Sequence, residues 1–109
     1  MKYNIIISEN FEKEFKPLYK KYKSLKADVL KVQDNIEKEL LIATDLGSGF
    51  KKIRVTVTSK NKGSSGGARL ITHDAIVAVD KTNVVFGSIY SKGQYKTIDI
   101  KILKEILGL

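Results

Sequence analysis

The sequence predicts an α+β protein built as one domain over residues 1–109. Two patterns of apolar residues favour this class. Apolar residues recur at helical spacings of three and four between residues 9 and 43, and they alternate with polar residues from residue 50 onward. A chain of this length buries about two-thirds of its unfolded surface, which is enough for one core. The order strand, two helices, four strands and one helix favours two helices packed on one face of a sheet.

The first predicted elements are a strand and a helix. Apolar side chains alternate over residues 2–7, which indicates a short strand, and Ser8 follows as a helix N-cap. Pro17 lies inside the helical pattern and should kink the helix or shift its start, because proline removes a backbone donor. The apolar stripe that predicts this helix is Phe11, Phe15, Leu18 and Tyr22.

A second helix is predicted from the cap at Ser24 to about Ala43, which gives an αα-hairpin. Its apolar stripe is Leu25, Val29, Val32, Ile36 and Leu40. Residues 45–49 then supply glycine, serine and aspartate, which are typical of a turn.

The rest of the chain predicts a four-stranded antiparallel meander and a short C-terminal helix. The first of these strands alternates Ile53, Val55 and Val57 with Lys52 and Arg54, so one face is buried and the other is basic. The polar, glycine-rich residues 59–67 predict an exposed loop. The other three strands and the helix are expected at residues 68–73, 75–80, 84–90 and 99–107, with Gly108 as the helix stop.

Composition excludes several kinds of chemistry. Because the chain has no cysteine, it has no disulfide, no thiolate metal site and no cysteine nucleophile. Its one histidine, His73, cannot form a two-histidine metal site. The longest apolar run, residues 75–79, is far too short to span a membrane, and the first residues lack a signal-peptide core. We therefore expect a cytoplasmic protein with no membrane association.

The positive charge is concentrated in the middle of the chain. The net charge is +8, yet residues 1–45 and 74–109 contribute only +1 each. Residues 46–73 contain no acidic side chain and contribute +6. Such a segment attracts a polyanion such as a nucleic acid. Its basic residues are Lys51, Lys52, Arg54, Lys60, Lys62 and Arg69.

Three segments of this region have a recognisable sequence. They are Phe50-Lys51-Lys52-Ile53-Arg54-Val55, the lysine-rich loop that runs into Ser65-Gly66-Gly67-Ala68-Arg69, and Ile89-Tyr90-Ser91-Lys92. Together they resemble the RelE/ParE superfamily of bacterial toxins, specifically its HigB-like RelE branch, and the resemblance covers nearly the whole chain. It implies a microbial-RNase-like fold and cleavage of mRNA on the ribosome without a metal or other cofactor. It also implies a small cognate antitoxin as partner and a toxin that is monomeric when alone.

The resemblance also implies a set of site residues. The catalytic candidates are Arg69, Lys52, Arg54, Lys92 and Tyr90. Among the RNA-binding candidates, the resemblance implies Lys60 and Lys62. Three more are assigned from the residues themselves: Lys51 by its charge in the basic segment, and Tyr95 with the adjacent Lys96 because a tyrosine can stack on a base. The sequence departs from the branch in two places: Ser64 stands where another lysine is frequent, and Gly93-Gln94 stands where a serine and an acidic residue often follow.

The candidate residues suit RNA cleavage by attack of the 2′-hydroxyl on the neighbouring phosphate. Arg69 offers phosphate a bidentate fork, and clustered cations stabilise the charge that builds on the phosphate oxygens. The proton acceptor is Lys52 or Lys92, with a pKa lowered by neighbouring cations, or His73. Two other functions stay open: a ParE-like inhibitor of DNA gyrase, and a family member that binds RNA or its antitoxin without cutting.

Overall fold

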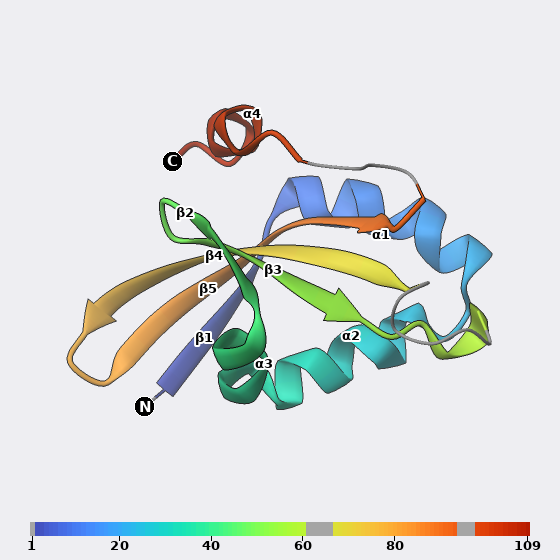
Figure 1. Cartoon of the computed structure of the whole chain (residues 1–109), viewed down its shortest axis with the longest axis horizontal. Coiled ribbons are helices and arrows are strands. Elements are labelled where there is room, and N and C mark those ends of the chain that lie inside the picture. Colours follow the sequence, from blue (N-terminus) through green and yellow to red (C-terminus); the bar gives the residue numbers. More distant parts are fainter. Residues whose placement is uncertain (1, 61–66, 94–97) are drawn as a thin grey trace.

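The computed structural model describes residues 2–60, 67–93 and 98–109, in which a curved five-stranded mixed sheet runs through the middle of the molecule (Figure 1). The strands lie in the order β1-β5-β4-β3-β2; β1 is parallel to β5, and the other neighbours are antiparallel. The strands are β1 Lys2–Ile7, β2 Thr44–Gly47, β3 Phe50–Val55, β4 Ala68–Ala78 and β5 Lys81–Ser91. The helices are α1 Glu9–Lys21, α2 Leu25–Asp34, α3 Ile36–Ile42, α4 Ile100–Ile106 and the 3₁₀-helix η1 Thr58–Lys60.

The α+β class is confirmed, but the predicted set of strands is matched only in part. Three of the residues expected as a turn at 45–49 belong to β2, which pairs with β3. The reversal itself is confined to Gly47, Ser48 and Gly49, all at positive φ. The two strands expected at 68–73 and 75–80 form the single strand β4. Asp74 does not interrupt β4 because its carboxylate pairs with Lys51 on the neighbouring strand.

The predicted helices are also partly corrected. The hydroxyl of Ser8 accepts the Phe11 amide hydrogen at 3.0 Å, as an N-cap does, and α1 continues through Pro17. The single helix expected up to Ala43 is wrong: it is divided at Asn35, whose backbone leaves the helical region and whose side chain donates to the Lys31 carbonyl at 2.9 Å.

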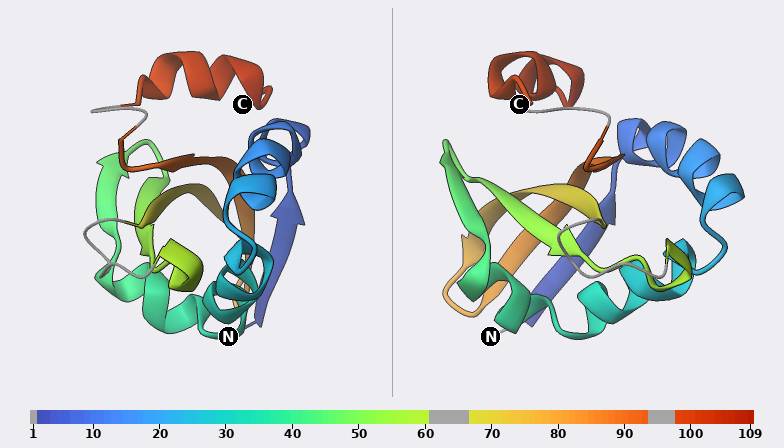
Figure 2. Two further views of the ribbon diagram at one scale, coloured as in Figure 1. Left: turned by 90° about the vertical axis from the view of Figure 1, so that its right-hand side faces the viewer. Right: turned by 45° about the vertical axis from the view of Figure 1, so that its right-hand side comes forward.

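Two apolar clusters lie on opposite faces of the sheet. The larger cluster joins α1, α2 and α3 to the sheet through residues such as Leu25, Leu70 and Phe86. On the other face, Leu103 of α4 packs with Phe50, Ile71 and Tyr90. The two views of Figure 2 place α4 across the sheet from α2 and α3. The expected packing of the helical hairpin on one face agrees with this arrangement, and α4, for which no face was predicted, makes the second face partly buried.

The C-terminal helix begins where the sequence predicted. The carboxylate of Asp99 accepts hydrogen bonds from the amides of Lys101 and Ile102, so this residue is the N-cap of α4. Gly108 ends the helix at a φ of +72°. Within residues 2–60, 67–93 and 98–109, no helix is both long and apolar enough to cross a membrane.

Candidate functional site

A row of candidate residues crosses three neighbouring strands. Arg54 of β3 is opposite Arg69 of β4, and Arg69 is opposite Tyr90 of β5. Side chains directly opposite one another in a sheet point to the same face, so these three residues form one cross-strand row. Lys52 lies two residues before Arg54 and shares its face. The face is the one against which α4 packs.

Arg69 and Tyr90 are the buried part of this row. The side chain of Arg69, only 8% exposed, donates from Nη1 to the Ala68 carbonyl at 3.1 Å, which fixes the guanidinium beside the strand. Burial raises the pKa of the Tyr90 phenol above its ordinary value, and the nearby charge of Arg69 opposes that rise. Tyr90 is therefore protonated at neutral pH and can donate a hydrogen bond.

The remaining catalytic candidates surround this buried pair at the accessible surface. Arg54 is exposed and Lys52 is half-buried. Lys92 is exposed just beyond β5, and its backbone amide donates to the carbonyl of Gly67 at 3.1 Å. That bond ties the end of β5 to the start of β4. The structure thus brings all five catalytic candidates to one end of the sheet.

Lys51 does not belong to this group. Its position alternates with Lys52, so it shares the helix-covered face with Ile53, and its ammonium pairs with the Asp74 carboxylate at 3.0 Å. The expected role of Lys51 in RNA binding therefore lacks support from the geometry. The other four RNA-binding candidates fall outside what the structure describes: the side chain of Lys60, and the residues Lys62, Tyr95 and Lys96. The two positions at which the sequence departs from the toxin branch, Ser64 and Gln94, also lie outside the described residues.

His73 shares the face of Arg69 by strand alternation, but it lies far from Arg69 along β4. It packs edge-on against the ring of Phe50, with 4.8 Å between ring centroids. It is four residues from Arg69 along β4, which corresponds to about 13 Å at the rise of a strand. This separation is too long for His73 to accept a proton at a phosphate that Arg69 holds.

Asp28 positions the segment that enters the lysine-rich loop, and sequence reasoning missed this role. The carboxylate of this buried residue accepts three hydrogen bonds: from the Ser24 hydroxyl at 2.7 Å, the Thr58 amide at 3.0 Å and the Thr58 hydroxyl at 2.7 Å. Ser24, which was expected to cap α2, instead accepts the Ser59 amide hydrogen at 2.8 Å. The only sequence signal was an acidic residue in the first turn of a helix.

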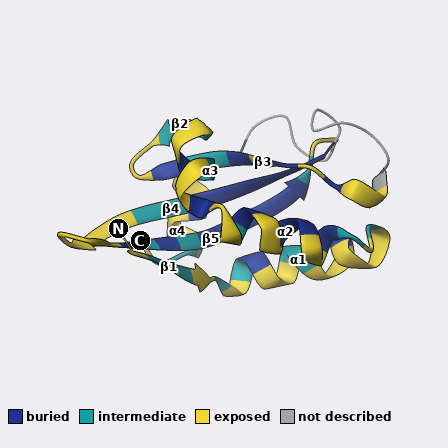
Figure 3. Cartoon of the chain, turned by 90° about the horizontal axis from the view of Figure 1, so that it is seen from below, coloured by how far each residue is buried: buried dark blue, intermediate teal, exposed yellow. Residues whose placement is uncertain are grey.

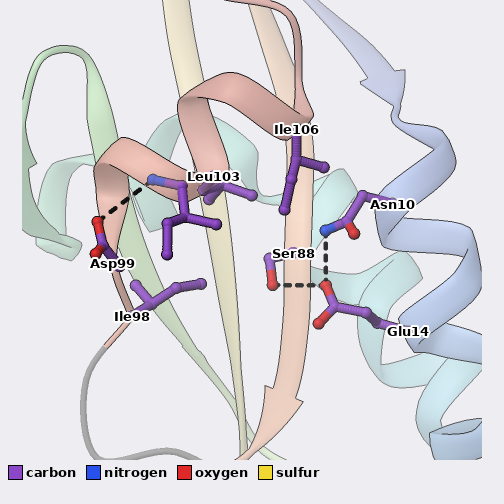
Figure 4. Close-up of a pocket in the computed structure, with 8 residues that line it drawn as sticks. Asn10, Glu14, Ser88, Ile98, Asp99, Leu103 and Ile106 are labelled. Atoms are coloured by element: carbon purple, nitrogen blue, oxygen red, sulfur yellow. Dashed lines mark hydrogen bonds between the residues drawn. The ribbon is translucent and has the colours of Figure 1, made fainter.

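The cavity between α1, β5 and α4 is not a phosphate site. Its volume is about 200 Å³, and Figure 4 shows Glu14 on its floor, held by Asn10 at 2.9 Å and by Ser88 at 2.7 Å. Among the described residues that line it, Asp99 is the other charged one, so this part of the lining has two carboxylates and no cation. A polyanion would be repelled there, which leaves the basic row as the candidate site.

No group of three potential metal ligands occurs among residues 2–60, 67–93 and 98–109. In comparisons with known proteins, no family model matches this chain and no curated protein sequence matches it significantly. The candidate site therefore rests on its own geometry: two arginines and a buried tyrosine in one row, with lysines on either side.

Proposed function

We propose that this protein is the toxin of a toxin–antitoxin pair, an endoribonuclease that cuts mRNA on the ribosome without a metal. The observation that carries the proposal is the cross-strand row of Arg54, Arg69 and Tyr90, with Lys52 and Lys92 beside it. Lys52, Arg54 and Arg69 lie between Asp45 and Asp74, a segment that contains no acidic residue. Fixed cations and a phenolic donor on one face suit a phosphate group of RNA.

Each residue of the row has a role in the proposed reaction. The 2′-oxygen attacks phosphorus and the bond to the 5′-oxygen breaks, which leaves a 2′,3′-cyclic phosphate. Arg69, fixed by its bond to the Ala68 carbonyl, stabilises the charge that builds on the phosphate oxygens. Lys52 or Lys92, as the neutral amine, accepts the 2′-proton, and the protonated phenol of Tyr90 supplies a proton to the leaving oxygen. Arg54 binds an adjacent phosphate.

The test is cleavage of mRNA on translating ribosomes, read as new 5′ ends. We expect the wild type to produce new ends and Arg69→Ala to lose activity by about 100-fold or more. Because Arg69 is buried, Arg54→Ala is the second variant, since the exposed Arg54 is removed without disturbing the core. Lys81→Ala removes the same charge at the far end of β5 and should cleave like the wild type.

Two results would contradict this function. One is a wild type that leaves translated mRNA intact, and the other is equal cleavage by the wild type and both arginine variants. A purified protein that blocks DNA supercoiling by gyrase while mRNA stays whole would favour the inhibitor alternative. We further propose a cytoplasmic location and an acidic antitoxin segment that covers the basic row, because opposite charge favours such a partner.

A further inference from the structure

A second basic segment lies in the helical half of the chain. Residues 1–45 are nearly neutral as a whole, yet residues 15–27 contain five lysines and no acidic residue. These lysines occupy the second half of α1, the start of α2 and the turn between the two helices. All five are exposed, and none forms an ion pair within the described part of the chain. We call this set the lysine corner: Lys16, Lys20, Lys21, Lys23 and Lys26.

Hydrogen bonds join the lysine corner to the basic segment of the sheet. The Ser24 hydroxyl bonds with the Ser59 hydroxyl at 2.9 Å and accepts the Ser59 amide hydrogen at 2.8 Å, while Asp28 holds Thr58. Figure 1 shows η1, which begins at Thr58, beside the turn between α1 and α2. Thr58 follows Arg54 by four residues, which span at most about 14 Å of chain. The lysine corner and the cross-strand row are therefore neighbours at one end of the molecule.

The lysines at the start of α2 are not explained by helix stability. The first turn of a helix carries a partial positive charge, so acidic residues are favourable there and lysines are unfavourable. Lys23 nevertheless precedes α2, and Lys26 lies in its first turn. Asp28 is buried and its carboxylate already accepts three hydrogen bonds, so it adds little negative charge to this surface. Exposed lysines that oppose the helix charge indicate an anionic ligand outside the chain.

An exposed tyrosine lies among these lysines. Lys16, Tyr19 and Lys20 recur at spacings of three and four, so they share one face of α1. Lys16, Tyr19 and Lys26 also line the groove of about 390 Å³ between α1 and α2, in which Glu12, one turn farther from the corner, is the one acidic residue of the described lining. Figure 3 shows exposed residues along both helices up to the turn that joins them.

This combination favours single-stranded RNA as the ligand. Surfaces that bind single strands combine cations that follow the backbone with aromatic side chains on which bases stack. Tyr19 is 41% exposed, so its ring is accessible to a base. An acidic protein segment would satisfy the lysines alone, and it would leave the exposed tyrosine without a role.

We propose that the lysine corner binds the phosphates of the same RNA strand that is cut at the cross-strand row. The strand runs from the row past Thr58 to the turn between α1 and α2. Contacts of lysine with phosphate carry no sequence information, and they position the strand. The inference rests on the proposed function for the place of the cut, but it concerns binding and is tested without cleavage.

The test is the affinity for RNA that cannot be cut, measured by fluorescence anisotropy. The probes are 2′-O-methyl oligonucleotides of about 6 and about 16 nucleotides, which cover the usual range of single-strand sites. The variant combines Lys20→Gln, Lys23→Gln and Lys26→Gln. Its affinity for the longer probe should fall about tenfold or more at about 0.1 M salt, and its affinity for the shorter probe should fall clearly less. The slope of log affinity against log salt should decrease by about 2, from about 0.7 for each lost contact.

A matched control removes the same charge at the opposite end of the sheet. It combines Lys2→Gln, Lys38→Gln and Lys81→Gln, all exposed in the wild type. Lys2 is in register with Lys81, and Lys38 lines a cavity with Tyr3 of β1. This control should bind both probes like the wild type. Both variants should keep the circular dichroism of the wild type, because only exposed side chains change.

Equal loss of affinity by the two variants, or no loss by the lysine-corner variant, would overturn the proposal. The second result would leave these lysines to an acidic protein segment. RNA binding that depends on the lysine corner, together with mRNA that stays whole on ribosomes, would contradict the proposed function and support this inference. Cleavage of mRNA by a protein whose lysine-corner variant binds RNA unchanged would contradict this inference alone.

Discussion

Asp28 and Thr58, thirty residues apart in sequence, are joined by two hydrogen bonds to one carboxylate. One bond comes from the Thr58 amide and the other from its hydroxyl, and the Ser24 hydroxyl donates a third. These hydrogen bonds connect the first turns of α2 to Thr58, which lies between β3 and the lysine-rich loop. A buried carboxylate with three donors is well compensated. When it is removed, the Thr58 amide and hydroxyl lose their acceptor, whereas the Ser24 hydroxyl still has the Ser59 hydroxyl as an acceptor at 2.9 Å.

Asp28→Ala should therefore be destabilising. We expect the free energy of unfolding to fall by about 1 to 3 kcal/mol, because the Thr58 amide and hydroxyl lose their acceptor in two part-buried hydrogen bonds. The measurement is urea denaturation followed by circular dichroism. Asp34→Ala, at the exposed end of the same helix, should change the free energy of unfolding by less than about 0.5 kcal/mol. Equal effects of the two substitutions would contradict the assigned role of Asp28.

Tyr90 predicts a loss of stability at high pH. Its pKa in the folded protein is above the ordinary value near 10, so the folded state binds its proton more tightly than the unfolded state does. The stabilisation is complete below pH 10 and is lost as the pH rises through the raised pKa. Relative to Tyr90→Phe, the wild type should lose stability from about pH 10 upward. Parallel pH profiles of the two proteins would contradict this.

The ion pair between Lys51 and Asp74 is expected to matter for stability and not for cleavage. Both side chains are mostly buried, and Asp74 Oδ1 has no hydrogen-bond partner, so the loss of Lys51 leaves the carboxylate poorly compensated. Lys51→Met should cost about 1 to 3 kcal/mol in urea denaturation. Lys13→Met, which breaks the exposed pair with Glu9, should cost less than about 0.5 kcal/mol. A large loss of RNA cleavage by folded Lys51→Met would place Lys51 in the site after all.

Pro17 predicts a stabilising substitution. It is exposed inside the continuous helix α1, where it supplies no amide to the carbonyl of Lys13. Pro17→Ala restores that bond and a good helix former, so thermal unfolding should shift upward by an amount that corresponds to about 1 to 3 kcal/mol. Lys16→Ala, one position earlier and also exposed, is the control and should have little effect. A destabilised Pro17→Ala would mean that α1 depends on the proline.

Local signals in the sequence located much of this fold. Ser8 and Asp99 were predicted as caps and cap their helices. The alternation around Ile53 predicted the face that carries Lys52 and Arg54. The same alternation could have excluded Lys51 from that face, since it has the parity of Ile53; it was assigned to RNA binding on charge alone.

Features that depend on distant partners could not be found in this way. Residues 44–47 have little strand pattern of their own, and they form β2 because β3 offers an edge. The apolar stripe of α2 continues past Asn35 without a break, so the sequence pattern gives no sign that the helix is divided. The division into α2 and α3 results from the non-helical backbone of Asn35. The three hydrogen bonds of Asp28 join segments thirty residues apart, and no local rule predicts them.

The parallel pairing of β1 with β5 has a consequence for synthesis of the protein. Lys2 is in register with Lys81, and Asn4 reaches Asn83 across 79 residues of sequence. In a nascent chain, β1 therefore lacks this strand neighbour until β5 has been synthesised. Such non-local contacts slow folding, because a long loop must close before they form. The edge of β1 that pairs with β5 is accessible to chaperones during the synthesis of the residues between them.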